Sequence, residues 1–111
     1  MWTGNQNADG PFSNLGFKPA IVIIKNTDFS DAPWYIFDCA RDPYNPVRYN
    51  LNPNNAETEE DDTNGTWDWA SNGMKMTSAG THPNNNNSTI MYWAWAENPF
   101  ANLYGGQSNA R

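Results

Sequence analysis

The sequence predicts an all-β fold, an antiparallel two-sheet β-sandwich of the jelly-roll-like kind with about six to eight strands. Two observations predict this class. Asn, Gly, Pro, Thr and aromatic residues dominate the 111 residues, whereas Leu occurs three times, and this favours strands joined by turns over helices. Several segments also alternate apolar and polar residues between strong turn signals. The length suits one domain, so residues 1–111 are expected to form a single β-sandwich domain.

The N-terminal half holds two strongly predicted strands. Residues 16–25 contain four consecutive β-branched side chains, which predict a strand buried on both faces. Residues 34–38 alternate between two faces and predict a second strand. The connection between them, residues 26–33, has the length of a hairpin loop, so the two strands are expected to be neighbours.

The segments on either side of these strands are less regular. Residues 1–16 are rich in Gly and Asn, with Trp2 and Phe12 as isolated apolar anchors. Residues 41–57 contain three prolines, each of which removes a backbone donor and favours extended geometry in the residue before it. This stretch predicts an irregular excursion with a short edge strand near residues 47–51.

The C-terminal half predicts a hairpin and a long final strand. Residues 66–69 and 74–76 alternate on either side of Asn72-Gly73, a strong turn signal. In residues 89–97, one face carries smaller side chains and the other carries Met91, Trp93, Trp95 and Glu97. This contrast predicts a central strand that packs closely on one side. Because Leu and Ile are scarce, most of the tryptophans on the predicted strands are expected in the core, namely Trp34, Trp67, Trp69, Trp93 and Trp95.

Charge and cysteine content exclude several classes of protein. The formal net charge is −6, with no basic patch, so nucleic acid and anionic membranes are not expected as partners. The single cysteine, Cys39, cannot form an intrachain disulfide and is expected to be a small buried side chain. The N-terminus has neither the basic nor the apolar region of a signal peptide, and no apolar run is long enough to span a membrane.

The search for catalytic and metal-binding patterns gives little. One Cys and one His cannot make a zinc site, and His82 is expected as a solvated loop residue rather than a catalytic base. Asp38, Asp68 and Glu97 lie on or beside predicted strands, where two carboxylates could flank a sugar, but no paired motif supports this. The acidic run at residues 57–62 could offer oxygen ligands to Ca²⁺, although its spacing matches no EF-hand. The sequence therefore predicts no enzyme, no metal and no cofactor.

The order of motifs along the chain resembles a known family. It resembles the C-terminal domain of unknown function found in tailed-phage tail-fibre and related virion proteins, with departures at Met74, where an aromatic is usual, and in the Trp-rich last strand. The resemblance covers nearly the whole chain. It rests on these segments: Trp2-Thr3-Gly4-Asn5, Asp9-Gly10-Pro11-Phe12, Gly16-Phe17-Lys18-Pro19-Ala20, Lys25, Trp34-Tyr35-Ile36, Asp38, Arg41, Asn45-Pro46, Leu51, Asn72-Gly73-Met74-Lys75, Tyr92-Trp93-Ala94-Trp95-Ala96-Glu97-Asn98-Pro99-Phe100 and Asn109-Ala110-Arg111.

The resemblance implies a non-enzymatic structural module of the virion, of the tail-fibre or receptor-binding type, used for display or for attachment to the host surface. If Met1 is the native start, a capsid decoration (cement) protein bound at capsomer junctions fits equally well. A carbohydrate-binding module is a further alternative, because Trp and Tyr rings are platforms for sugars. The expected partners are further copies of the chain in a homotrimer, other virion proteins and a host surface glycan.

Binding is expected on loops, which a rigid β scaffold holds in place. Residues 41–55, 57–64 and 78–88 are the long polar loops. The first offers Tyr44 and Tyr49 among prolines, and the third offers the neutral amides of Asn84, Asn85, Asn86 and Asn87. These six residues are the predicted binding site, and the alternative is that the loops are solvated connectors.

Overall fold

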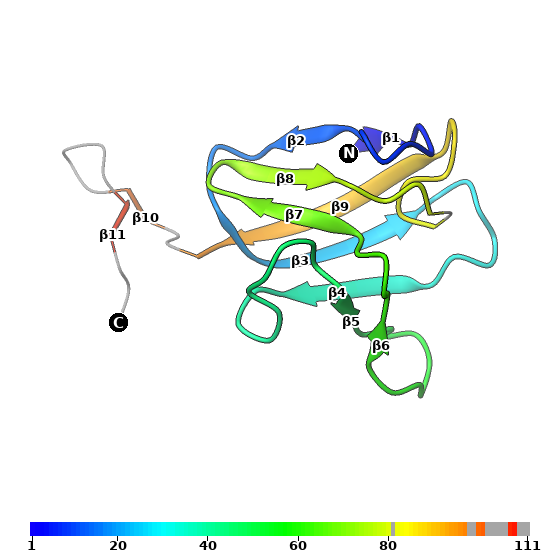
Figure 1. The fold of residues 1–111 in the computed structure, drawn as a ribbon. Coiled ribbons are helices and arrows are strands. Elements are labelled where there is room, and N and C mark those ends of the chain that lie inside the picture. The colour runs from blue at the N-terminus through cyan, green and yellow to red at the C-terminus, as the bar shows by residue number, and fades with distance from the viewer. Residues whose placement is uncertain (81, 98–99, 102–106, 109–111) are drawn as a thin grey trace.

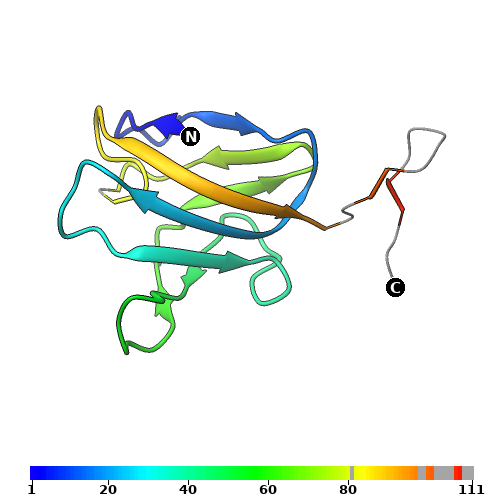
Figure 2. The same cartoon turned by 180° about the vertical axis from the view of Figure 1, so that it is seen from behind.

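The computed structural model describes residues 1–80, 82–97, 100–101 and 107–108. In these residues the fold is all-β without a helix, and therefore without a helix that could span a membrane. Strands β1 to β9 form three antiparallel sheets, and β10 (Phe100–Ala101) pairs with β11 (Gln107–Ser108) beyond them (Figures 1 and 2). The predicted all-β class is confirmed. The strands outnumber the prediction because several of them, such as β1 (Trp2–Thr3) and β6 (Glu60–Asp61), span only two residues and leave no alternation in the sequence.

The larger sheet has four strands in the order β1-β9-β3-β4. Its strands are β1 (Trp2–Thr3), β9 (Thr89–Ala96), β3 (Pro19–Asn26) and β4 (Trp34–Asp38). Neighbouring strands pair antiparallel, and Val22 of β3 lies between Ala94 of β9 and Phe37 of β4. As predicted, β3 and β4 are neighbours, and β9 lies inside the sheet.

A three-stranded sheet has the order β2-β8-β7. Its strands are β2 (Phe12–Asn14), β8 (Gly73–Met76) and β7 (Trp67–Ala70). The predicted hairpin is confirmed, because β7 pairs with β8 and Ala70 lies opposite Gly73 at the turn. Figures 1 and 2, seen from opposite sides, show this sheet layered against the four-stranded sheet.

The third sheet is short and lies beside β4. It pairs β5 (Tyr49–Asn50) with β6 (Glu60–Asp61). The predicted edge strand near residues 47–51 is therefore present. The acidic run, in contrast, was expected to be loop throughout. It contains β6 because Arg48 binds the Asp61 carboxylate at 2.7 and 2.9 Å and so holds β6 against β5.

One hydrophobic core is built by side chains from both larger sheets. The Phe37 ring of β4 meets the Trp67 ring of β7 with centroids 4.8 Å apart, and Trp67 meets Trp69 at 5.2 Å. Aromatic and methionine side chains fill the volume that Leu fills in other domains. The core residues are Trp2, Val22, Ile24, Tyr35, Phe37, Val47, Trp67, Trp69, Met74, Met76 and Ile90.

Three expectations about burial were wrong. β3 is not buried on both faces, because Val22 and Ile24 are buried while Ile21 on the opposite face is 39% exposed. Trp93 and Trp95 of β9 point outward with 43% and 52% exposure, and Trp34 of β4 is half-buried on the same outer face, so these three are not core residues. The physical reason is the same for both strands: none of the described residues covers the outer face of the four-stranded sheet. Cys39 is only half-buried, although this burial raises the pKa of its thiol.

Candidate binding surface

Apolar side chains gather on the outer face of the four-stranded sheet. Strand pairing places Trp93 beside Ile23 and Ile23 beside Ile36, while Trp95 lies beside Ile21 in the next row. Leu51 extends this surface through its bridge to Ile36. The surface, called the outer aromatic face below, consists of Ile21, Ile23, Trp34, Ile36, Leu51, Met91, Trp93 and Trp95.

Two tryptophans at the centre of this face stack on each other. Trp34 of β4 and Trp93 of β9 stack with ring centroids 5.6 Å apart and an interplanar angle of 24°. Because β3 lies between their strands, the two rings meet over β3. Stacked rings lose little further conformational freedom when a partner covers them, so this is a preorganised contact surface.

Charged residues close one end of the outer aromatic face. Lys18 and Glu97 form an ion pair at 3.0 Å where β9 ends, and the bond to Glu97 raises the pKa of Lys18. Asp38, opposite Ile21 at the end of β4, lies 4.0 Å from Arg41. An apolar centre with a charged edge is the usual composition of a protein–protein interface.

The predicted loop tyrosines are exposed. Tyr44 follows β4 and is 77% exposed, and Tyr49 on β5 is 37% exposed with the Arg48 guanidinium 5.9 Å from its ring centroid. Both side chains can be reached by a partner. Whether they bind one stays a prediction.

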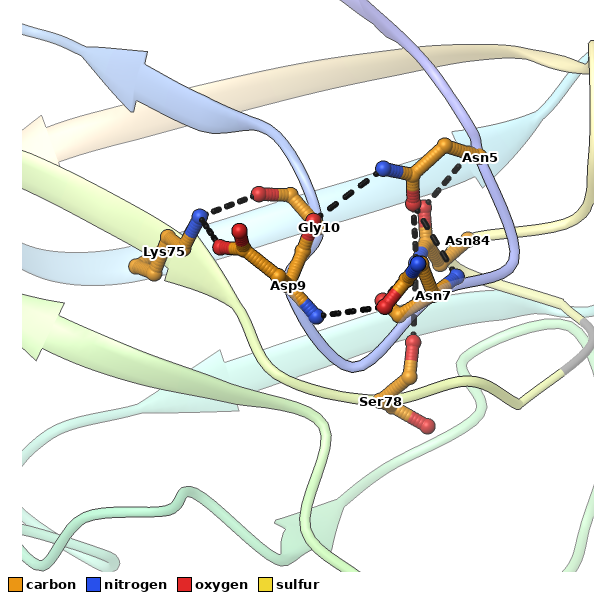
Figure 3. A network of polar contacts seen from close by, with 7 residues as sticks. All are labelled: Asn5, Asn7, Asp9, Gly10, Lys75, Ser78 and Asn84. Atoms are coloured by element: carbon orange, nitrogen blue, oxygen red, sulfur yellow. Dashed lines mark hydrogen bonds and ion pairs between the residues drawn. The ribbon is translucent and has the colours of Figure 1, made fainter.

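Asn84, however, is not available to a ligand, and its assignment to the binding site was wrong. It is fully buried, and its amide nitrogen donates to Asn5 Oδ1, the Asn7 carbonyl and the Ser78 carbonyl at 2.8 to 3.1 Å (Figure 3). Its Oδ1 accepts from the Asn5 backbone. Every polar atom of the side chain is thus used to join the N-terminal loop to the loop before β9.

The other three asparagines of that run have different environments. Asn86 and Asn87 are exposed, and Asn87 has a left-handed backbone with φ of 60°. Asn85 is half-buried, and its carbonyl would lie 2.1 Å from a Cβ at Gly4, so Gly4 allows the two loops to approach closely. Of the four amides, only those of Asn86 and Asn87 are fully open to a partner.

The three carboxylates considered for sugar chemistry do not lie on one face. Asp38 and Glu97 lie on the outer face of the four-stranded sheet, whereas Asp68 lies opposite Lys75 in the three-stranded sheet. In the acidic run, Arg41 binds Glu59 and Arg48 binds Asp61. Within residues 1–80 and 82–97, no group of three or more His, Cys, Asp or Glu side chains is placed to hold a metal ion.

His82 is not the solvated loop residue that was expected. It is half-buried, and its Nδ1 lies 2.7 Å from the Tyr35 hydroxyl, while its carbonyl accepts from Asn26 Nδ2 at 3.0 Å. The pairing joins positions 47 residues apart, and nothing in the local sequence around His82 signals it.

Comparison with known proteins gives one result. The family model described as "Domain of unknown function (DUF7483)" matches residues 1–99. No curated protein and no solved structure matches the chain.

Proposed function

We propose, from the premise that the chain belongs to the DUF7483 family, that it is a non-enzymatic structural module of a phage virion. In this proposal it is a tail-fibre or receptor-binding component that displays or attaches at the host surface. The resemblance of its ordered motifs to tail-fibre C-terminal domains supports the virion location. The contribution of both larger sheets to one core supports a two-sheet, jelly-roll-like sandwich as its architecture.

The outer aromatic face is the observation that carries the proposal. Large contiguous apolar surfaces on a folded chain mark interaction sites, and Trp and Met are enriched at the centre of protein interfaces. Here Met91, Trp93 and Trp95 lie side by side on a central strand with 37%, 43% and 52% exposure. We assign this face to contacts between copies of the chain, in a homotrimer, and to other virion proteins.

The oligomer can be tested with a matched pair of variants. Trp93→Ser combined with Trp95→Ser removes the apolar centre of the outer aromatic face. Phe12→Ser is the control, because Phe12 is 45% exposed on the three-stranded sheet. At roughly 50 µM, sedimentation equilibrium should give a trimer for the parent and for Phe12→Ser, and a monomer for the double variant. A monomeric parent, or a double variant that stays trimeric, would refute the assignment.

The location in the particle needs a second experiment. Cryo-electron microscopy of the whole virion should place the chain at the tail. Density at capsomer junctions would replace the tail-fibre role with the capsid decoration alternative. The exposed Trp93 and Trp95 rings also favour a carbohydrate-binding module as a second alternative, since flat aromatic surfaces can hold sugar rings. A glycan array with the Trp95→Ala variant as control distinguishes it, because sugar binding through this face would disappear in the variant.

A further inference from the structure

A cleft of about 420 Å³ lies on a different part of the molecule from the outer aromatic face. It is bordered by the inner side of β4, by the short β5–β6 sheet and by the loop that precedes β9. Its main side chains are Tyr35, Phe37, Asn50, Glu60, Asp62 and His82. No sequence motif marked these residues as a group.

The cleft has an ordered aromatic wall. The Tyr35 and Phe37 rings stack with centroids 6.2 Å apart, and both side chains are at most 9% exposed. The Tyr35 hydroxyl is fixed by His82 Nδ1 at 2.7 Å, and His82 is in turn tied to β3 through Asn26. This wall can pack against an aliphatic or aromatic stem without first being ordered.

A second part of the cleft lining, called the acidic wall, carries carboxylates. Glu60, Asp61 and Asp62 line it, and of these Asp61 is neutralised by Arg48 at 2.7 Å. Among the described residues no cationic side chain pairs with Glu60 or Asp62. The pKa of the Tyr35 hydroxyl is raised, first by burial and then by the negative charges of Glu60 and Asp62. All three side chains line the cleft, so the carboxylates make it electronegative. Such a site repels anions and attracts cations.

Asn50 is an independent sign of a ligand. It is 4% exposed, it lines the cleft, and its Oδ1 accepts no hydrogen bond from any residue that the structure describes. A buried acceptor without a donor is costly in a folded protein. The unmatched acceptors around the cleft are therefore Asn50 Oδ1 and the Glu60 carboxylate. The Asp62 carboxylate, which already accepts from the Asn64 backbone and from Thr66 Oγ1, adds a second negative charge beside them.

We propose that this cleft binds the side-chain ammonium of a lysine presented by a protein partner. An ammonium group offers three donors and no acceptor, which matches Glu60, Asp62 and Asn50 Oδ1. The four-carbon stem of lysine would pack along Tyr35 and Phe37. A neutral sugar suits the site less well, because its hydroxyl groups need donors as well as acceptors.

The test uses small probes and the intact chain. N-acetyl-lysine amide is titrated to roughly 50 mM into ¹⁵N-labelled protein while backbone amide shifts are followed by NMR. Shifts are expected at Tyr35, Asn50 and Thr66 and should weaken as salt is added. N-acetyl-norleucine amide, which has the stem without the charge, should produce none. Equal effects of the two probes, or no effect of either, would overturn the proposal.

Substitutions test whether the acidic side chains of the cleft are needed to bind N-acetyl-lysine amide. Glu60→Gln should raise the apparent Kd for N-acetyl-lysine amide roughly tenfold, because a charge-assisted hydrogen bond becomes a neutral one. Glu57→Gln, an exposed neighbour outside the cleft, is the control and should change nothing. Asp62→Asn is a second variant with the same expectation. If Glu60→Gln and Asp62→Asn both bind as the parent does, the acidic wall is not the recognition element and the proposal fails.

Two further experiments ask which amine binds and whether the cleft contributes to assembly. Glucosamine that binds where N-acetyl-lysine amide does not would overturn the lysine assignment and give the cleft to an amino sugar. Glu60→Gln should leave the trimer intact, because Glu60 is not part of the outer aromatic face. Loss of lysine binding is thereby distinguishable from loss of assembly.

Discussion

Asn5 and Asn84, which are 79 positions apart, exchange two hydrogen bonds. The Asn5 backbone amide donates to Asn84 Oδ1 at 3.0 Å, and Asn84 Nδ2 donates to Asn5 Oδ1 at 3.1 Å. Lys75 holds the same N-terminal loop from the other side through the Asp9 carboxylate at 2.7 Å (Figure 3). A Gly- and Asn-rich segment with few apolar residues is thus held in place by the hydrogen bonds of one buried asparagine and by an ion pair.

Asn84→Ala should therefore destabilise the fold by about 3 kcal/mol, because it removes every hydrogen bond that this buried amide makes to Asn5, Asn7 and Ser78. The expected change in the thermal midpoint is a fall of roughly 10 °C, measured by circular dichroism. Asn86→Ala is the matched control and should melt with the parent, since Asn86 is exposed. A normal midpoint for Asn84→Ala would mean that the network adds little to stability.

Two methionines give a second comparison. Met76 is 1% exposed in the core, whereas Met91 is 37% exposed on the outer aromatic face. Met76→Ala should cost about 3 kcal/mol through lost burial and a residual cavity. Met91→Ala should lower the free energy of unfolding far less. It is measured in the monomeric double variant Trp93→Ser, Trp95→Ser, so that assembly does not contribute. Urea denaturation gives both values, and equal losses would contradict the outward orientation of Met91.

Protonation of the Asp28 carboxylate should cause part of the loss of stability in acid. Its carboxylate accepts the Thr89 backbone N–H at 2.7 Å, and this bond lowers the pKa of Asp28 below its usual range. A lowered pKa in the folded state means that the contribution is present above the unfolded pKa and is lost as the pH falls through the folded value. Asp28→Asn should thus be less stable than the parent at pH 7, and the difference should vanish as the pH falls through the lowered pKa of the folded state. Asp31→Asn, at a second exposed aspartate of the same loop, is the control.

Tyr44 and Tyr49 provide the test of the loop site. Changing both to Ala should leave the thermal midpoint nearly unchanged, because the side chains are 77% and 37% exposed. Attachment to the host or virion partner should weaken, as measured by binding of the purified chain to host cells or to the particle. A collapse of the midpoint would instead show that the tyrosines stabilise the fold, and unchanged attachment would remove them from the site.

Much of the fold could be predicted because alternation and turn signals are local. The strands at residues 34–38, 67–70 and 73–76 and the long final strand all follow from them. Alternation shows which side chains share a face, but it does not show which face is covered. For this reason Trp93 and Trp67 looked equivalent in the sequence, although Trp67 is fully buried and Trp93 is 43% exposed.

The candidate sites were harder to predict because distant segments build them. Four consecutive asparagines are indistinguishable in sequence, and only the approach of the N-terminal loop makes Asn84 a buried structural residue. The cleft combines β4, the β5–β6 sheet and the loop at His82, whose pairing with Tyr35 spans 47 positions. Tertiary packing brings these distant segments together, and no short sequence pattern indicates that it will.

The pairing of Trp2 with Ile90 has a consequence for biosynthesis. Among the described residues, the sheet partner of β1 is β9, which lies almost at the other end of the chain. The N-terminal strand therefore emerges from the ribosome long before its partner exists, and the central β9 arrives last of the four strands in its sheet. Folding must largely follow synthesis, and pairing over such long sequence separations is intrinsically slow. Nascent chains halted before Thr89 should accordingly remain open to proteases.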